Sequence, residues 1–265
     1  MTGTAAGTPI QGAVYEIIDV RTGKVVDQIV TDARGVAASK PLPLKRYQAK
    51  EVSAPMYWRL SDQVFDLTLE FAGQIIKVTD YDKPSQLGVA LTKTGIREVL
   101  AGNKMSYTFT VANTSNVALD SFYFHDKIPY DVTSVSAITT GTYNQRLTYR
   151  VLYKTNVNEY RVLASNLLTT NNYAFQVSSL PLMAGEVVTD IYYDFGTVPV
   201  GFQCVAKPTL TVSVSPTAVN GYQVINRADA GGKYGGTWQS ANAAWITIVR
   251  NLTPVKKIPL PKTGY

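Results

Sequence analysis

The feature that most constrains this chain is the alternation of apolar and polar side chains in many short segments. In residues 105–112, four apolar residues (Met105, Tyr107, Phe109 and Val111) alternate with polar or small ones. A period of two is typical of a β-strand with one buried face. Turn-forming Gly, Asn, Asp and Pro residues separate these segments, and helix signals are absent from the sequence. The pattern therefore predicts an all-β protein.

Composition agrees with this prediction and excludes several classes of function. The chain has 265 residues, which is one large or two ordinary domains, and its 17 Tyr and 17% charged residues favour strands. The net charge of +6 is scattered, which argues against nucleic-acid binding. No apolar run reaches the roughly 18 residues of a membrane span. A single cysteine, Cys204, excludes an internal disulfide.

The spacing of the strand patterns predicts two Ig-like β-sandwich domains in tandem. The first occupies residues 1–84, the second and larger one residues 85–252, and residues 253–265 form an extended tail. In the first domain, strands 8 to 12 residues apart are typical of a sandwich. Its strands are expected at Gly12–Ile18, Val25–Thr31, Tyr47–Ser53, Val64–Phe71 and Gln74–Thr79.

Two motifs of the first domain resemble a known family. The opening Gly12-Ala13-Val14-Tyr15 and the later run from Tyr47 through Glu51 to Ala54-Pro55-Met56-Tyr57 are similar to Cna B-type domains of pilins. That family carries an isopeptide bond between a lysine on the first strand and an Asn or Asp on the last, promoted by a glutamate. The resemblance implies that Glu51 is the promoter and that Asp80 occupies the acceptor position.

The lysine of that bond is not found in the first domain. By the resemblance it belongs about a dozen residues before Gly12, and the nearest lysine, Lys24, lies on the wrong side of the first hairpin. We therefore expect no bond in this domain, with Glu51 and Asp80 as a vestigial site.

The second domain resembles the Cna A-type Ig-like domains of collagen adhesins and pilins. Four separated blocks carry the likeness, and they contain Lys93-Thr94-Gly95, Gly102-Asn103 with the strand that follows, Asp126 to Pro129, and Asn226-Arg227-Ala228. The family joins a lysine to an asparagine next to an aspartate. The resemblance implies that Lys93 is the nucleophile, Asn226 the acceptor and Asp126 the promoter, and Asn251 at the end of the last strand is the alternative acceptor.

Elementary chemistry explains why such a bond needs burial. A lysine amine attacks only when neutral, and a dry environment disfavours its ammonium form. The same burial keeps an aspartate protonated, so that it can polarise the asparagine carbonyl and transfer a proton to the leaving ammonia. Contact in a rigid core then supplies an effective concentration on the order of 10⁵ M or more, which takes the place of an enzyme.

The C-terminal residues Leu260-Pro261-Lys262-Thr263-Gly264 resemble the LPxTG sorting signal of Gram-positive surface proteins. Sortase cuts that signal between threonine and glycine and joins the threonine to a new amine. The proline and glycine suit an extended peptide that an enzyme approaches closely. The motif implies a chain exported from the cell and attached through Thr263 to peptidoglycan or to another pilus subunit.

Enzymatic chemistry is the less favoured alternative. His125 is the only histidine, which together with one cysteine excludes a His/Cys metal site, and no cofactor motif is present. Asp190, Asp194 and Glu186 are acidic candidates for a carbohydrate-active hydrolase, but no partner motif accompanies them.

The sequence thus predicts a structural and adhesive protein of the Gram-positive cell surface, not an enzyme. No clear Tyr-Pro-Lys pilin motif occurs, which favours a minor or basal pilus subunit over a shaft subunit. The alternative is a standalone adhesin or ligand-binding stalk. Expected partners are sortase, other pilus subunits or peptidoglycan, and a host or matrix ligand.

Overall fold

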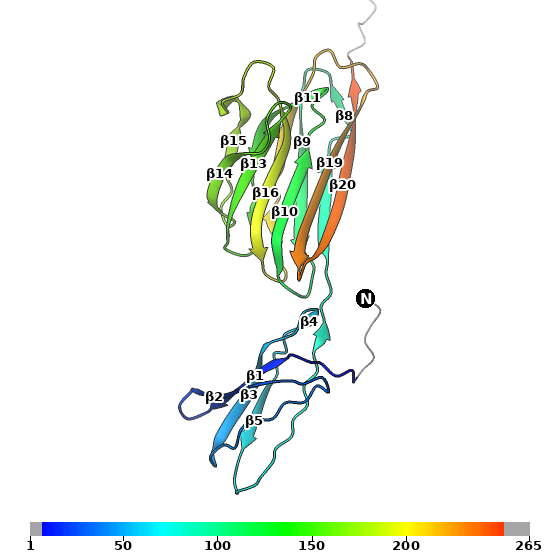
Figure 1. Cartoon of the computed structure of the whole chain (residues 1–265). Helices are drawn as coiled ribbons and strands as arrows, with labels where there is room; N and C mark the ends of the chain where they lie inside the picture. Colours follow the sequence, from blue (N-terminus) through cyan, green and yellow to red (C-terminus); the bar gives the residue numbers. More distant parts are fainter. Residues whose placement is uncertain (1–6, 252–265) are drawn as a thin grey trace, which may run out of the picture. The chain divides into compact units, whose positions relative to one another are not determined.

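The computed structural model describes residues 7–251, and strands make up nearly all of its regular structure (Figure 1). The chain forms two compact units, Met1–Leu87 and Gly88–Tyr265. The only helical element among the described residues is a single 3-10 turn, η1 (Val177–Ser179). The prediction of an all-β chain with two β-sandwich units is therefore confirmed.

The first unit is built on a four-stranded antiparallel sheet in the order β2-β1-β3-β5. A two-stranded pair, β4-β6, accompanies it. Its strands are β1 (Val14–Asp19), β2 (Val25–Val30), β3 (Arg46–Ser53), β4 (Trp58–Arg59), β5 (Val64–Thr68) and β6 (Lys83–Pro84). The core of this unit is small: Ile17, Tyr47 and Ala49 are buried, and six half-exposed apolar residues pack around them.

One strand predicted for the first unit is wrong. Residues 74–79 belong to no strand, although their sequence alternates like one. Strand β5 ends at Thr68, and no strand among the described residues pairs with the segment that follows. A strand exists only where a neighbour accepts its main-chain hydrogen bonds, so a favourable side-chain pattern is insufficient here.

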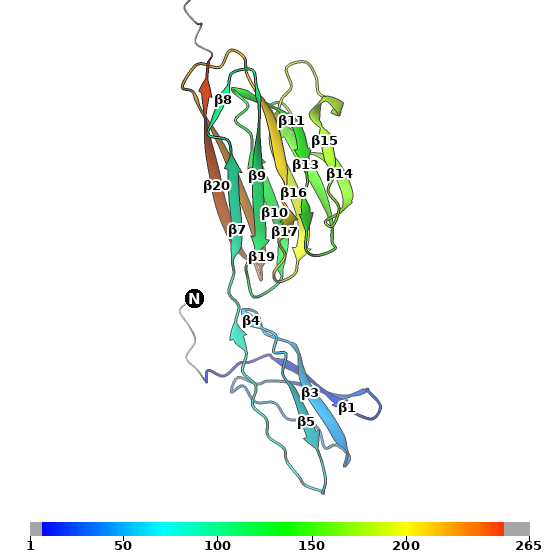
Figure 2. The same cartoon turned by 180° about the vertical axis from the view of Figure 1, so that it is seen from behind.

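The second unit packs a seven-stranded sheet against a five-stranded sheet (Figures 1 and 2). The seven-stranded sheet has the order β14-β13-β16-β10-β19-β20-β8, antiparallel except for the parallel pair β20-β8. Its strands are β8 (Glu98–Leu100), β10 (Leu119–Lys127), β13 (Thr148–Thr155), β14 (Arg161–Leu168), β16 (Val188–Val198), β19 (Gln223–Tyr234) and β20 (Thr237–Arg250).

The five-stranded sheet has the order β15-β11-β18-β9-β7. Strands β12 and β17 form a separate two-stranded sheet. The strands are β7 (Val89–Gly95), β9 (Lys104–Asn113), β11 (Thr133–Thr139), β12 (Thr142–Tyr143), β15 (Ala174–Gln176), β17 (Cys204–Ala206) and β18 (Thr209–Val214).

Aromatic rings fill the space between the two sheets of the second unit. Phe109 of β9 meets Phe124 of β10 with ring centroids 4.8 Å apart. Phe122 packs edge-on against Phe202, 5.8 Å away. Buried rings in such tilted and edge-to-face contacts add about 0.5–1.5 kcal/mol per pair beyond the area they remove from water. This dense apolar core is the environment in which the polar residues described below are buried.

The glycine-rich run 231–236 forms part of the hairpin between β19 and β20, and its first glycines are buried. Gly231 and Gly232 lie in β19, and only Gly235 and Gly236, with φ of 53° and 86°, form the turn into β20. A Cβ atom at Gly232 would lie 3.0 Å from Leu119 and from Phe122. Glycine is therefore required here because neighbouring side chains fill the space.

Overpacking at this position is expected to destabilise the second unit. Gly232→Val forces Leu119 and Phe122 to move, at a cost of about 1–3 kcal/mol in the free energy of unfolding. The matched control is Ser240→Val, which adds the same side chain at an exposed position of the adjacent strand β20. Denaturant titration compares the two variants, and equal stability of both would contradict the packing argument.

Candidate functional site

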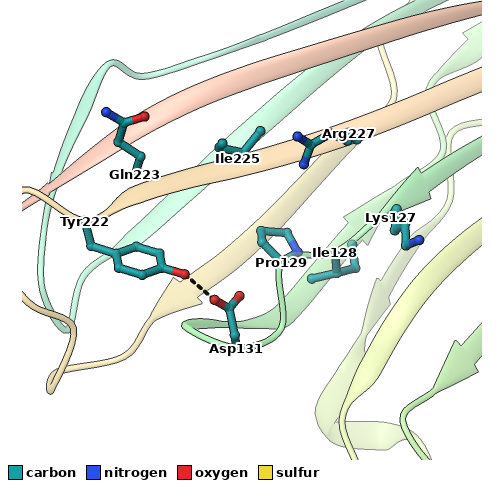
Figure 3. Close-up of a pocket in the computed structure, with 8 residues that line it drawn as sticks. All are labelled: Lys127, Ile128, Pro129, Asp131, Tyr222, Gln223, Ile225 and Arg227. Carbon is teal, nitrogen blue, oxygen red and sulfur yellow. Dashed lines mark hydrogen bonds between the residues drawn. The ribbon is translucent and has the colours of Figure 1, made fainter.

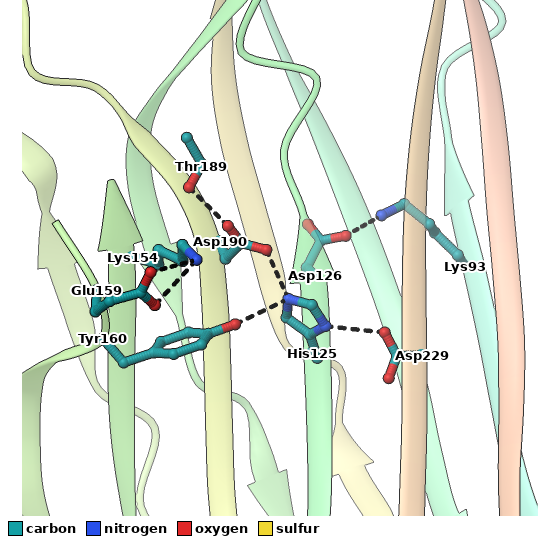
Figure 4. Close-up of polar contacts among 9 residues, drawn as sticks. All are labelled: Lys93, His125, Asp126, Lys154, Glu159, Tyr160, Thr189, Asp190 and Asp229. Carbon is teal, nitrogen blue, oxygen red and sulfur yellow. Dashed lines mark hydrogen bonds and ion pairs between the residues drawn. The ribbon is translucent and has the colours of Figure 1, made fainter. Parts of the chain in front are cut away.

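Lys93, Asp126 and Asn226 come together in the core of the second unit. The Lys93 ammonium nitrogen contacts Oδ1 of Asp126, and Nδ2 of Asn226 donates to Oδ2 of Asp126 at 3.3 Å. Figure 4 shows the first of these contacts. Lys93 lies on β7 of the five-stranded sheet, whereas the other two residues lie on β10 and β19 of the seven-stranded sheet. The cluster therefore connects the two layers of the sandwich.

The alternation of each strand directs these polar side chains inward. Asp126 continues the buried series Phe122 and Phe124 on β10. Asn226 lies between the buried residues Val224 and Ala228 on β19. All of these positions have the parity of apolar core residues, so the strands place a lysine, an aspartate and an asparagine where hydrophobic residues normally pack.

Burial decides the charge state of the pair. The Lys93 side chain is 0% exposed, and its nitrogen lies 4.5 Å from the ring centroid of Phe109 and 4.9 Å from that of Tyr107. Burial lowers the pKa of Lys93 to about 8, although Asp126 opposes the shift. Burial also raises the pKa of Asp126, against the opposing effect of Lys93. Both shifts favour a neutral amine beside a neutral carboxyl group.

The Asn226 side chain contributes an unpaired acceptor. Asn226 is fully buried, and its Oδ1 has no hydrogen-bond partner among the described residues. Turning the amide over would place this oxygen toward Asp126, because the nitrogen now contacts that carboxylate. A protonated Asp126 would then donate to the amide oxygen. That hydrogen bond polarises the carbonyl carbon that an amine attacks.

Asn251, the alternative acceptor, lies elsewhere. It follows the end of β20 and is exposed, and its backbone N–H donates to Oδ1 of Asn220 at 3.1 Å. No contact joins Asn251 to Lys93 in the described part of the chain. The geometry therefore brings Asn226, and not Asn251, to the lysine.

In the first unit, Glu51 and Asp80 come close together around Ser61. Oε2 of Glu51 accepts from the backbone N–H of Ser61 at 2.6 Å, and the Ser61 hydroxyl donates to Asp80 at 2.9 Å. The Tyr15 hydroxyl also donates to Asp80, at 3.2 Å. Sequence reasoning missed a third carboxylate, Asp82, whose charge acts on Glu51. Burial, together with Asp82 and Asp80, raises the pKa of Glu51 to about 7.

No cation neutralises this cluster. None of the ion pairs formed among residues 7–251 includes Glu51, Asp80 or Asp82. Lys24 lies at the turn between β1 and β2 and is exposed. Glu51 and Asp82 form a side-chain hydrogen bond with each other, which requires that one of the two carboxyl groups is protonated. The described part of the first unit thus holds three carboxyl groups close together, none of them in an ion pair.

A second polar cluster lies around His125 in the second unit (Figure 4). Nδ1 of His125 is 2.9 Å from Asp229, and Nε2 is 2.8 Å from Asp190. Burial lowers the pKa of His125, but the two aspartates outweigh this effect, so the pKa lies above its ordinary value. Only the doubly protonated ring donates to both carboxylates. The ring then links β10 to β19 and β16. Sequence reasoning missed this cluster, because the contacts depend on the pairing register of the three strands.

The other acidic candidates for enzyme chemistry are separately neutralised. Asp194 is paired with Arg150 at 2.8 Å. Glu186 pairs with Arg161, and hydrogen bonds from the Met183 N–H and from neighbouring side chains lower its pKa to about 2. Asp190 is held by His125 and by the Thr189 hydroxyl. These carboxylates do not form the converging pair that a glycoside hydrolase requires.

The described part of the chain holds no grouped metal ligands, and it has one notable surface hollow. Within residues 7–251, no group of His, Cys, Asp and Glu is arranged to hold a metal ion, and no helix is long and apolar enough to span a bilayer. A surface hollow of about 320 Å³ lies at the end of β10 and the start of β19 (Figure 3). The Tyr222 hydroxyl donates to Asp131 on its rim. The hollow shares no residue with the buried cluster.

Comparison with known proteins relates the chain to pilin subunits. Residues 2–84 match the SpaA family of prealbumin-like fold domains. Over 138 residues the chain is 22% identical to the trypsin-resistant surface T6 protein of Streptococcus pyogenes, a match that covers 51% of this chain and 26% of that protein. The matched region is thus about a quarter of the T6 protein.

Solved pilin structures resemble the chain only distantly. BcpA, the major pilin subunit of Bacillus cereus, is 11% identical with a TM-score of 0.35 and coverage of 92% of this chain and 66% of that one. The major pilin SpaD of Corynebacterium diphtheriae is 15% identical with a TM-score of 0.35, covering 92% and 63%. The first unit thus matches the prealbumin-like SpaA domains, and about half of the chain is similar to the T6 surface protein.

The predicted sorting signal, Leu260 to Gly264, lies outside the described residues. Its role therefore stays a prediction from sequence.

The His125 cluster predicts a pH dependence of stability. Because the pKa of His125 is raised in the folded state, its stabilisation is complete below the ordinary histidine pKa and disappears as the pH rises through the folded-state value. His125→Gln should therefore lower the free energy of unfolding by up to about 2 kcal/mol at about pH 6 and by much less at about pH 9.

Calorimetry of both proteins at the two pH values measures this difference. Taking the difference between wild type and variant cancels the titration of groups that do not interact with His125. An effect of His125→Gln that is equal at both pH values would show that the ring is not charged in the folded protein.

Proposed function

We propose that this chain is a structural and adhesive subunit of the Gram-positive cell surface, of the minor or basal pilin type, stiffened by an isopeptide bond between Lys93 and Asn226. The observation that carries the proposal is the buried cluster in which Lys93 and Asn226, from opposite sheets, both contact Asp126. The prealbumin-like first unit and the similarity to the T6 surface protein support the same class.

The bond forms by a transamidation that needs no further reagent. The neutral Lys93 nitrogen attacks the side-chain carbonyl carbon of Asn226, while the protonated Asp126 donates a hydrogen bond to the amide oxygen. The bond from carbon to Nδ2 then breaks, and Asp126 transfers the proton that the attacking amine releases to the departing nitrogen. Ammonia leaves and a secondary amide remains, so that atoms and charges balance.

A bond at this place would harden the second unit without a disulfide. It would join β7 of the five-stranded sheet to β19 of the seven-stranded sheet, across the core. The crosslink would close a loop of about 130 residues (226 − 93), which by analogy with a disulfide adds about 5 kcal/mol through the entropy of the unfolded chain. Stiffening of this kind suits a protein exposed outside the cell.

Attachment is the second part of the proposal. Sortase would cleave after Thr263 and join it to peptidoglycan or to another pilus subunit, which would place the protein outside the cell as an anchored component. A standalone adhesin with the same anchor is the alternative role, and in either role a host or matrix ligand is the expected contact. The separately neutralised carboxylates of the second unit argue against a surface hydrolase.

The isopeptide bond predicts a defined change of mass. Intact-mass spectrometry of the purified protein should give the sequence mass less one ammonia. Lys93→Ala, Asn226→Ala and Asp126→Ala should each restore the full mass and lower the melting temperature. Asp126→Ala is the most informative variant, because it removes no atom of the bond and still eliminates the proton donor.

Asn251→Ala is the matched control and should retain the mass loss. A wild-type mass equal to that of the sequence would contradict the bond. A mass loss that survives Asn226→Ala but disappears in Asn251→Ala would assign the acceptor to Asn251.

The sorting signal predicts a transpeptidation product. A sortase supplied with a glycine nucleophile should release Gly264-Tyr265 and leave Thr263 joined to the nucleophile, as seen by mass. Thr263→Ala should abolish the reaction, whereas Lys262→Gln, which changes the variable position of the motif, should retain it. Absence of product at every sortase concentration would remove the anchoring proposal and leave the isopeptide proposal intact.

A further inference from the structure

The surface hollow at the end of β10 and the start of β19 lies apart from the buried cluster. Its volume of about 320 Å³ is at the lower end of the range for small-molecule sites, about 300–1,000 Å³, so it accommodates a group of about one ring. Figure 3 shows two kinds of lining: Lys127 and Arg227 lie toward one end, and Tyr222 and Gln223 toward the other. The hollow is therefore cationic at one end and polar without positive charge at the other.

Lys127 and Arg227 place like charges directly opposite each other. They are partners in the antiparallel pair β10-β19, and both are exposed. Like charges in this relation destabilise a sheet. Neither residue forms an ion pair within the described part of the chain. Asp190, the partner of Lys127 on its other side, is held by His125 and Thr189. An anionic group between the two cations would relieve their repulsion.

The rest of the lining combines apolar surface with a hydrogen-bond acceptor. Ile128, Pro129 and Ile225 form the apolar part. The exposed carboxylate of Asp131 accepts a hydrogen bond from the Tyr222 hydroxyl and has further acceptor capacity. It would accept from hydroxyl groups of an occupant but would repel a second anionic group. The lining therefore fits an occupant with one anionic group, hydroxyl donors and an apolar ring face.

We propose that the hollow binds a sugar ring that carries a carboxylate, as part of an acidic glycan. Its carboxylate lies between Lys127 and Arg227, where the guanidinium group binds it through two parallel hydrogen bonds. Its hydroxyl groups donate to Asp131, and the apolar face of the ring covers Ile225 and Pro129. This inference rests on the proposed adhesive function, for which it names the class of ligand.

Two other kinds of anion fit the lining less well. An acidic peptide brings carboxylates without hydroxyl donors, so that Asp131 would face further negative charge. Inorganic phosphate binds between the cations but leaves the apolar part of the lining exposed to water. A carboxylated sugar is the class that uses all three parts of the lining.

NMR titration of the nitrogen-15-labelled full-length chain tests the proposal. Sialyllactose and a hyaluronan tetrasaccharide are the acidic probes from two sources, and lactose is the neutral comparator. At least one acidic probe should shift the amide signals around the hollow in a saturable manner, and lactose should bind at least about tenfold more weakly. Equal affinity for lactose, or saturable shifts with neither acidic probe, would overturn the proposal. Shifts with tetraglutamate but with neither glycan would assign the hollow to an acidic peptide instead.

Paired variants show whether the lining directs the binding. Lys127→Gln with Arg227→Gln should lower the affinity for the acidic probe at least about tenfold. The charge-matched control, Lys104→Gln with Lys207→Gln, removes two exposed cations elsewhere in the second unit and should bind like wild type. An equal loss in both double variants would show a general effect of charge and overturn the assignment to the hollow.

Asp131→Ala separates a sugar from a simple anion. The variant should weaken binding of the acidic glycan, because it removes the acceptor for the hydroxyl groups. A gain in affinity would show that only the negative charge of the probe is recognised, and it would overturn the assignment to a sugar.

Intact mass of the same samples distinguishes this inference from the proposed bond. Lys127 and Arg227 directly follow Asp126 and Asn226, but their side chains point to the opposite face of the sheet. Lys127→Gln with Arg227→Gln should therefore keep the mass of the wild type. Absent glycan binding with a retained loss of ammonia would overturn the glycan site alone. Glycan binding by a wild type of full sequence mass would contradict the bond alone.

Discussion

The contact between Lys93 and Asp126 is the interaction on which the rest of the second unit depends. Both side chains are almost completely removed from water, and two buried charges lose several kcal/mol of hydration each that their mutual attraction only partly restores. The shifts of both pKa values toward neutrality reduce this loss, because a neutral amine and a neutral carboxyl group are cheaper to bury. The same neutrality makes the amine a nucleophile and the carboxyl group an acid. The neutral forms of Lys93 and Asp126 therefore explain both why the core can bury the cluster and why the cluster is reactive.

Strand β10 carries polar clusters on both of its faces at adjacent residues. Asp126 points into the core toward Lys93 and Asn226, and His125 points to the outer face, between Asp190 of β16 and Asp229 of β19. The ring of His125 thus ties β10 to the strand that bears Asn226. Burial raises the pKa of Asp126. The charge of His125 opposes this rise, less strongly than Lys93 and Asn226 do. An outer clamp that holds the register of β10 and β19 helps to keep the acid and the acceptor within reach of each other.

Sequence reasoning predicted the parts of this structure that depend on local pattern. The period-two alternation of residues 105–112 predicted strand β9. The family resemblance predicted that Lys93, Asp126 and Asn226 belong to one site, and in the structure Lys93 and Asn226 both contact Asp126. The failures all depend on neighbours. The segment 74–79 has a strand's side chains but no pairing partner among the described residues. Asp82 approaches Glu51 only through the fold. Strand propensity is a property of one segment, whereas strand pairing and burial also depend on the segments that pack against it.

The two units differ in how their cores are stabilised. The second unit has a core of interlocking aromatic rings. Among its described residues, the buried polar atoms without a hydrogen-bond partner include the amide oxygen of Asn226, which the proposed bond would use, and the hydroxyl groups of Tyr143 and Tyr149. The first unit has only three buried apolar residues in its main cluster, and the backbone of residues 75–79 forms no hydrogen bond within the described part of the chain. Its burial of apolar surface is small relative to the entropy that folding must overcome.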